Sequence, residues 1–113
     1  MTYEVVMTQA VLDRIFAQAS YILNESRAPK RATAWLQMVM EAGQSLEEMP
    51  HRCERAEEDA HCSYEVRAMR VGTYVLLFTI DEQARKVWVL NARSSWQATR
   101  LQDLPSDLEG LED

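Results

Sequence analysis

Apolar residues recur along this chain with two different periods, and the change from one to the other limits the folds it can adopt. Between residues 9 and 46 they recur every three or four positions, in two runs separated by Pro29. This spacing is that of the buried face of an amphipathic helix, and it predicts helices over 9–24 and from Pro29 to before Pro50. Because only a few residues join these helices, we expect them to pack as an antiparallel hairpin.

The remaining apolar segments have the composition and period of strands. Residues 3–7 precede the helices, and from residue 64 apolar positions alternate with polar ones, as in a half-exposed strand. Residues 72–73, Gly-Thr, suit a two-residue turn into the apolar run 74–80, and a polar turn separates that run from a last strand over 86–93. The expected fold is therefore α+β, in the order β-α-α-β-β-β, with a helical hairpin packed on a small, mostly antiparallel sheet.

Length and composition agree with one compact domain. The chain has 113 residues, of which 47% are hydrophobic, with only 3 glycines and 3 prolines, so it can bury a core without a disulfide or metal to stabilise it. We expect a single domain over 1–102, a short helix after Trp96, and an acidic, flexible tail over 103–113. No apolar run approaches the ~20 residues that cross a bilayer, so we expect a cytoplasmic protein without a membrane partner.

Four potential metal ligands lie in the polar loop between the helices and the later strands: His51, Cys53, His61 and Cys62. Adjacent ligands such as His61 and Cys62 fit a single tetrahedral ion poorly, and the spacing matches no standard zinc motif. We therefore expect two reduced thiols, no metal and no cofactor.

The formal charge of −6 is distributed unevenly along the chain. Residues 47–63 carry six acidic and two basic side chains, and 103–113 carry five acidic side chains and no basic one. The region expected to form the sheet, 64–102, carries six basic against three acidic side chains. Most of the basic residues are arginines, whose planar fork suits phosphate or carboxylate. Either they form a basic binding surface, or they solubilise the sheet and pair with the acidic segments.

Three motifs, in a fixed order, carry a family resemblance. They are Pro50-x-Arg52-Cys53-x-x-Ala56-x-Glu58 after the helices, Glu65-Val66-Arg67-x-Met69 at the start of the sheet, and Gly72-x-Tyr74-x-Leu76-Leu77-Phe78-x-Ile80-Asp81 followed by Val87-x-Val89-Leu90-x-x-Arg93. Over about residues 3–96 the chain resembles the RelE/ParE superfamily of bacterial toxins from type II toxin–antitoxin, or plasmid-stabilisation, modules. The resemblance implies the fold given above and a cognate antitoxin as partner in a hetero-oligomer.

The resemblance also implies candidate site residues. Members of the superfamily that cut messenger RNA on the ribosome use basic residues of the sheet, with a Tyr or His near the C-terminus. Attack of a 2′-hydroxyl on phosphate needs cations and a proton-transfer group but no metal. Arg67 and Arg93 match two of the basic positions, and Tyr74 is a candidate acid or base. Because Val75 and Ser94 stand where the pattern usually has Arg and often has His, it stays open whether the chain is an enzyme.

Strand pairing gives an expected geometry for these three residues. With the tight turn described above and a regular last hairpin, Tyr74 lies opposite Arg93, and Arg67 points to the same face of the sheet. The alternative role of Arg67 is structural, in an ion pair with Glu65 or with an acidic residue of 54–59.

Three functions are compatible with these residues. The first is a ParE-like toxin that binds a cellular target such as DNA gyrase, which requires no catalytic histidine. The second is a ribosome-dependent mRNA endoribonuclease of the RelE type, against which the overall acidity counts. The third is a non-toxic relative that retains only antitoxin binding. In each case we expect the antitoxin to lay an amphipathic helix on the hairpin of 9–45, with Val39 on its exposed part, and an extended segment along the sheet.

Overall fold

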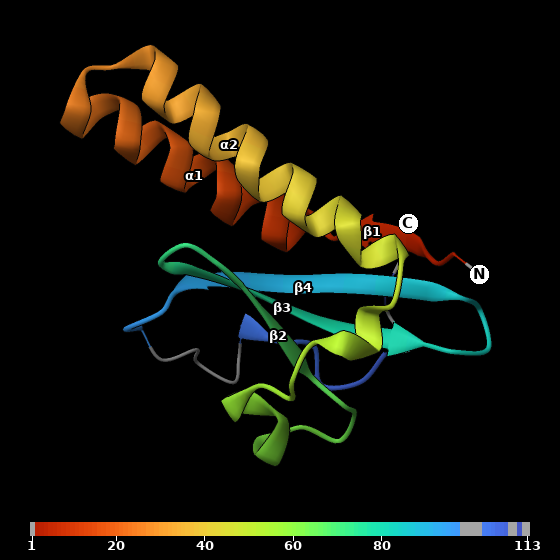
Figure 1. The fold of residues 1–113 in the computed structure, drawn as a ribbon. Coiled ribbons are helices and arrows are strands. Elements are labelled where there is room, and N and C mark those ends of the chain that lie inside the picture. Colours follow the sequence, from red (N-terminus) through yellow and green to blue (C-terminus); the bar gives the residue numbers. More distant parts are fainter. Residues whose placement is uncertain (1, 98–102, 109–110, 112–113) are drawn as a thin grey trace.

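The computed structural model describes residues 2–97, 103–108 and 111. Its helices and strands follow the expected order, which confirms the α+β fold (Figure 1). Three short 3-10 turns lie between the second helix and the second strand. The elements are β1 (Glu4–Met7), α1 (Gln9–Ser26), α2 (Pro29–Gln44), η1 (Ser45–Glu47), η2 (Pro50–Arg52), η3 (Glu57–His61), β2 (Arg67–Val71), β3 (Tyr74–Asp81) and β4 (Lys86–Ser94).

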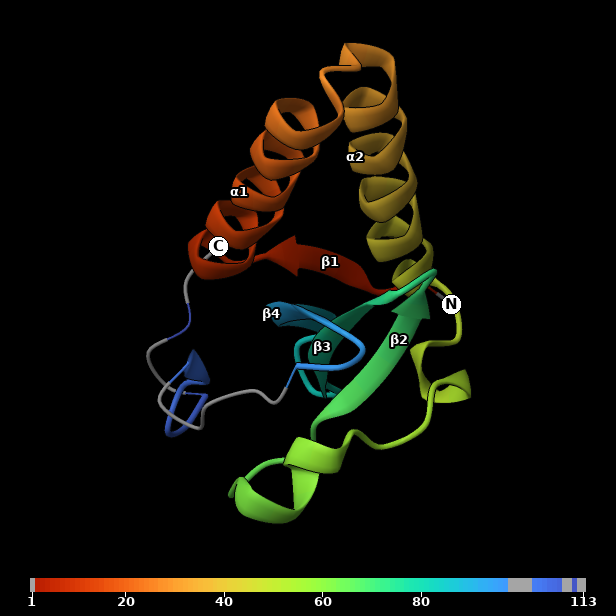
Figure 2. The same ribbon diagram turned by 90° about the vertical axis from the view of Figure 1, so that its left-hand side faces the viewer.

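Both helices begin at a start signal in the sequence. The Thr8 hydroxyl accepts a hydrogen bond from the backbone N–H of Val11 and so caps α1. Pro29 is the first residue of α2, where its fixed φ and missing N–H suit a helix. From the short turn that joins them, α1 and α2 diverge toward β1 on one side of the sheet (Figure 2). Within the described ranges, neither helix has the length and apolar character that crossing a membrane requires.

The four strands form one mixed sheet in the order β1-β4-β3-β2. β3 is antiparallel to both of its neighbours, and β1 lies parallel to β4 at one edge. Val71 pairs with Tyr74, so the predicted two-residue turn is confirmed. Gly72 has a φ of 62° in this turn, a left-handed conformation that glycine adopts without steric cost.

The sheet is buried on both faces, which explains the continuous apolar run of β3. The helices cover one face, and the loop before β2 and part of the C-terminal segment cover the other. The helix-side core contains Val11, Ile15, Val39, Leu46, Leu76, Phe78 and Val89. The opposite core contains Ala56, Val66, Val75, Leu77, Trp88, Leu90 and Leu104.

β2 begins at Arg67 and not at residue 64 as expected. The loop before it runs alongside the start of the strand and satisfies its backbone. The N–H of Ala56 donates to the carbonyl of Val66 at 2.9 Å, and the N–H of Ala68 donates to the carbonyl of Glu54 at 3.0 Å. This part of the sheet edge is therefore covered by the chain itself.

The described residues beyond β4 contact the rest of the domain. Asp103 pairs with Arg14 of α1 at 3.1 Å, and Leu104 is buried in the second core. The Tyr64 hydroxyl donates to the carbonyl of Pro105 at 2.7 Å. The segment expected as a flexible tail is thus in contact with the sheet where it begins. Trp96 lies in a turn, and most of the short helix expected after it falls outside the described residues.

Candidate functional site

A β-bulge in the last hairpin changes the expected geometry of the site. From the β3–β4 turn the register is regular as far as the pair Phe78–Val89, but the next pair is Leu77–Asn91. Leu90 is therefore an extra residue in β4. An extra residue reverses the alternation of side chains along the rest of the strand.

Beyond the bulge, Arg93 pairs with Val75, while Tyr74 pairs with Ser94. Val75 belongs to the core on the face away from the helices. Arg67 pairs with Phe78. Phe78 and Tyr74 both belong to the helix-side core. Directly opposed residues share a face, so Arg67 and Tyr74 lie on one face and Arg93 on the other. The expectation that all three share a face is wrong, because the bulge shifts the register by one residue.

The guanidinium of Arg67 is held by the chain itself. Its Nε donates to the carboxylate of Glu65, and its Nη1 donates to the carbonyls of Cys53 and His51, the latter at 3.3 Å. Only 17% of the side chain is exposed. Arg67 therefore ties the loop at η2 to the start of β2, in the ion pair with Glu65 that was its structural alternative.

Arg93 is held in the same manner on the opposite face. Its Nε donates to Oε2 of Glu58 at 2.7 Å, and its Nη2 donates to Oε1 at 3.3 Å. The side chains are 11% and 7% exposed, respectively. A bidentate pair of this kind is strong and directional. It fixes η3 against the end of β4 and neutralises the positive charge there.

Tyr74 lies at the floor of an open cleft of about 440 Å³ between α1 and the end of the sheet. Its ring meets that of Trp35 edge-on, with 5.3 Å between centroids. Burial raises the pKa of the Tyr74 phenol, and the charge of Arg14 opposes this rise only in part. A raised pKa favours a neutral phenol at neutral pH, so the environment does not activate Tyr74 as a base. The cleft is lined by Asp13, Arg14, Ala17, Gln18, Tyr21, Tyr74, Ala92 and Gln97.

The strand register identifies a further basic residue that the sequence analysis missed. Arg70 pairs with Val75, which also pairs with Arg93, so these residues form a row across the sheet on the face away from the helices. Arg70 is exposed. Arg70 lies three residues from Arg67 and therefore on the opposite face of β2, which was visible in the sequence. Only the bulge places Arg93 in the same row, with Val75 between the two arginines.

His51 belongs to a closed network at the opposite end of the sheet. Its Nε2 lies 2.8 Å from Oε1 of Glu82, and the Tyr3 hydroxyl donates to the same carboxylate at 3.0 Å. Arg85 stacks over the Tyr3 ring at 4.3 Å. These contacts join η2, the residue before β1 and the β3–β4 turn, and they give His51, Tyr3 and Arg85 partners within the chain.

Cys53 and Cys62 are free thiols. Burial raises the pKa of both, against partial lowering by arginines at Cys53 and by the Tyr64 hydrogen bond at Cys62. Protonated thiols are weak nucleophiles and poor metal ligands. Across residues 2–97, 103–108 and 111, no group of three His, Cys, Asp or Glu side chains is placed to hold a metal ion.

The helical hairpin displays apolar side chains to solvent. Phe16 is 51% exposed, and Leu23 lies two turns further along the same side of α1. Tyr21 is exposed beside the cleft, and Met38 is exposed on α2. Val39, expected on the exposed part of the second helix, is fully buried, because it faces the sheet. Exposed large apolar residues grouped on one structural unit are typical of a protein-binding surface.

The fold and these contacts define a small α+β domain with exposed apolar side chains on its helical hairpin. The chain belongs to the family of ParE toxins of type II toxin–antitoxin systems, whose family model matches residues 5–95. The matched range includes both helices and, apart from the first residue of β1, all four strands. None of the curated protein sequences matches this chain.

Solved structures that share the fold at low sequence identity include the following three. The chromosomal ParDE system of P. aeruginosa has a TM-score of 0.68 and 13% identity, covering 82% of this chain and 96% of that one. The RelBE2 toxin–antitoxin complex of Mycobacterium tuberculosis has a TM-score of 0.55 and 23% identity, covering 83% and 99%. The archaeal RelE–RelB complex of Pyrococcus horikoshii OT3 has a TM-score of 0.57 and 17% identity, covering 87% and 100%.

Proposed function

We propose that this ParE-family toxin inhibits its target by binding and not by cutting RNA, that the target is DNA gyrase, and that a cognate antitoxin neutralises it. The observation that carries the proposal is the state of the two candidate arginines. Each is held by a carboxylate of the chain itself, and they lie on opposite faces of the sheet.

RNA cleavage through a 2′-hydroxyl needs cations and a proton-transfer group that converge on one phosphate. Arg67 and Arg93 cannot meet on one phosphate across the sheet. Val75, where the family's nucleases usually have a second sheet arginine, is buried and uncharged. Tyr74 has a raised pKa and lies on the face away from Arg93. These observations support a toxin that inhibits its target by binding it and not by catalysis.

The exposed side chains of the hairpin support an antitoxin as the partner on that side. An amphipathic helix that buries its apolar face recognises apolar anchors spaced along a groove or a pair of helices. Phe16, Leu23 and Met38 are anchors of that kind. One of the solved structures with this fold is described as a toxin–antitoxin complex and another as a RelE–RelB complex.

Participation of Arg67, Tyr74 and Arg93 in target binding stays a prediction. Alanine at each position, expressed in cells, should reduce growth inhibition by more than the accompanying loss of folded protein explains if the side chain contacts the target. Lysine at either arginine position should rescue only in part if the contact is bidentate. Full growth inhibition by the Arg67→Ala, Arg93→Ala double variant would show that neither arginine is needed to bind the target.

Induced expression, followed by separate measurements of DNA synthesis and of translation, tests the proposal in cells. We expect DNA synthesis to fall first, with plasmid supercoiling altered, and translation to follow. A primary arrest of translation with cleaved messenger RNA would favour the endoribonuclease. A chain that affects neither process but still binds its antitoxin would be the non-toxic relative.

A further inference from the structure

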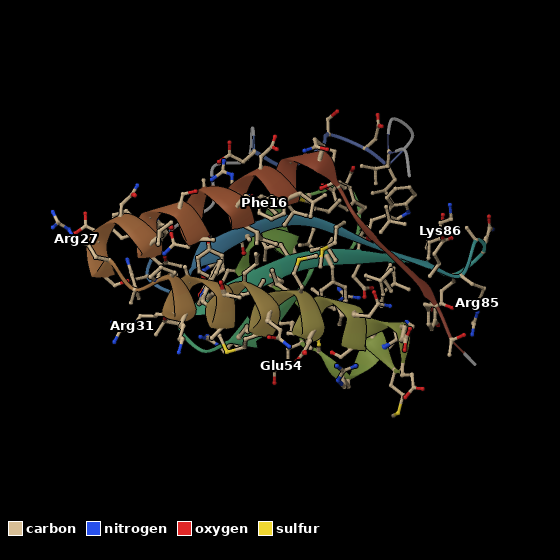
Figure 3. The ribbon with its side chains drawn as sticks, turned by 90° about the horizontal axis from the view of Figure 1, so that it is seen from above. Phe16, Arg27, Arg31, Glu54, Arg85 and Lys86 are labelled. Atoms are coloured by element: carbon tan, nitrogen blue, oxygen red, sulfur yellow. The ribbon has the colours of Figure 1, made fainter. Side chains whose placement is uncertain are left out.

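The free end of the helical hairpin carries a cluster of basic side chains. Arg27, in the turn, and Lys30 and Arg31, at the start of α2, are all exposed. We call these three residues the basic tip. Arg27 and Arg31 lie at the outermost end of the hairpin, far from Glu54 and Arg85 (Figure 3). Glu25 is the only acidic residue between residues 14 and 40.

The basic tip differs from most of the described cations in having no ion pair. Among the described residues, the three tip side chains and Arg70 are the basic groups without a carboxylate or carbonyl partner. Every other described basic side chain is engaged in an ion pair or hydrogen bond: Arg14, Arg52, Arg55, Arg67, Arg85, Lys86 and Arg93. Carboxylates elsewhere in the fold therefore neutralise most of these cations and leave those of the tip available.

The position of these cations opposes helix stability. The first turn of α2 contains no acidic residue, and its N-cap, Ala28, provides no side-chain cap. Lys30 and Arg31 add positive charge at the end of a helix where negative charge is favoured. Basic residues are disfavoured at this end of a helix, and no contact in the described structure compensates for them here. Residues kept against such a local preference are typically retained for function.

The composition of the tip indicates the chemistry of its partner. A protein interface usually has an apolar or aromatic anchor at its centre. The nearest exposed large apolar residue, Leu23, lies one turn before Arg27 on α1, and none falls among residues 24–34 at the tip itself. Single-stranded nucleic acid is bound by stacking on aromatic side chains, which the same segment lacks. Unpaired cations with short polar neighbours suit the phosphate backbone of a duplex.

The geometry points to the basic tip as a contact for the phosphate backbone of duplex DNA, independent of the protein target proposed above. The hairpin is two helices wide (Figure 2), but in its thinner dimension it measures one helix, about 10–12 Å, which fits the about 12 Å major groove of B-DNA and exceeds the narrow groove of A-form RNA. The molecule extends over 44 Å, several times the about 10 Å screening length in 0.1 M salt. The net negative charge of the chain therefore does not cancel the local field of its tip.

Fluorescence anisotropy of a labelled 30-base-pair DNA duplex, titrated with the full chain between 50 and 200 mM NaCl, tests this inference. Three phosphate contacts predict a slope of about −2.7 for the logarithm of the affinity against the logarithm of salt concentration. The triple variant Arg27→Gln, Lys30→Gln, Arg31→Gln should bind about tenfold more weakly or worse at 50 mM salt, with a slope near zero. Its thermal unfolding should match or exceed that of the wild type, since the variant removes unfavourable charge from α2.

The matched control is Arg52→Gln, Arg55→Gln, Arg85→Gln, which removes the same charge far from the tip. It should bind within about threefold of the wild type, because screening limits its effect at the tip. Equal loss in both triple variants would show an effect of net charge alone and overturn the inference. Absence of wild-type binding at 50 mM salt would also overturn it, as would equal or tighter binding to duplex RNA, to single-stranded DNA or to polyglutamate.

Discussion

Arg93, a candidate site residue by sequence, has a structural role in this fold. Arg93 forms a bidentate pair with Glu58, and both side chains are nearly buried. Breaking a buried pair by removing one partner typically costs about 3 kcal/mol or more, because the other charge keeps its desolvation without its counter-ion. The pair links η3 to β4, so its loss should also loosen the loop that covers the second core.

We therefore expect Arg93→Ala to lower the free energy of unfolding by about 3 kcal/mol in urea titration. Arg70→Ala is the matched control, since Arg70 is an exposed arginine in the same row of the same face. It should change stability by less than about 0.5 kcal/mol. Equal stability of the two variants would contradict a structural role for the Arg93–Glu58 pair.

Tyr64 supplies a pH-dependent contribution to stability. Burial, together with the neighbouring Cys62, raises the pKa of its phenol from 10.0 to about 12. The folded state thus favours the neutral phenol, which also donates to the carbonyl of Pro105. The resulting stabilisation is complete below pH 10 and is lost as the pH rises from 10 toward 12.

Tyrosinate absorbance during an alkaline titration should accordingly show one late step near pH 12 that Tyr64→Phe removes. Tyr21→Phe, which alters an exposed tyrosine, should leave that step in place. Persistence of that late step in Tyr64→Phe would contradict the burial of its hydroxyl against the C-terminal segment.

Among the connections between elements, the β2–β3 turn depends most on one residue type. Gly72 has a φ of 62°, and nothing lies within 4 Å of the position where a Cβ would be placed. A side chain at this position therefore clashes with no other atom, and its only cost is the strain of the backbone conformation. Gly72→Ala should cost about 1 kcal/mol and Gly72→Asn less, since asparagine tolerates this conformation better. Thermal unfolding of both variants tests this, and equal stabilities would contradict it.

The helical hairpin is the element on which we expect the antitoxin to dock. Phe16→Asp and Met38→Asp place a charge among the exposed apolar side chains, so each should weaken antitoxin binding by about tenfold or more. Ser20→Asp and Thr33→Asp introduce the same charge at exposed polar positions of the same helices and should have a smaller effect. Calorimetric titration with the antitoxin measures this, and unchanged binding of the apolar-to-Asp variants would place the antitoxin elsewhere.

The elements were predictable from sequence where local signals set them. Thr8 and Pro29 mark the helix starts, and Gly72 marks the turn. The bulge was not predictable, because residues 87–90 are apolar on both faces and give no alternation that would show a shift in register. The side chain of Asn91, beside the bulge, is buried, and its Oδ1 has no hydrogen-bond partner among the described residues.

At the scale of the whole molecule, charge is compensated between distant segments. The sequence assigns a positive surplus to the sheet region, yet Arg67, Arg85 and Arg93 each pair with a carboxylate in the fold. One of these carboxylates, Glu58, lies 35 residues from its arginine, and no local pattern predicts such a pair. The residue types of the candidate site were therefore predictable from sequence. The face of the sheet on which each residue lies, and which of the arginines are paired, were not.

We propose above that this toxin binds gyrase and does not cut RNA. Purified wild-type chain should be incubated with gyrase and supercoiled plasmid, and in parallel with ribosomes carrying messenger RNA. We predict that cleaved plasmid accumulates in the first reaction, that added antitoxin prevents this, and that the messenger RNA stays intact in the second. Cleavage of the messenger RNA at defined codons, with gyrase activity unchanged, would contradict the account.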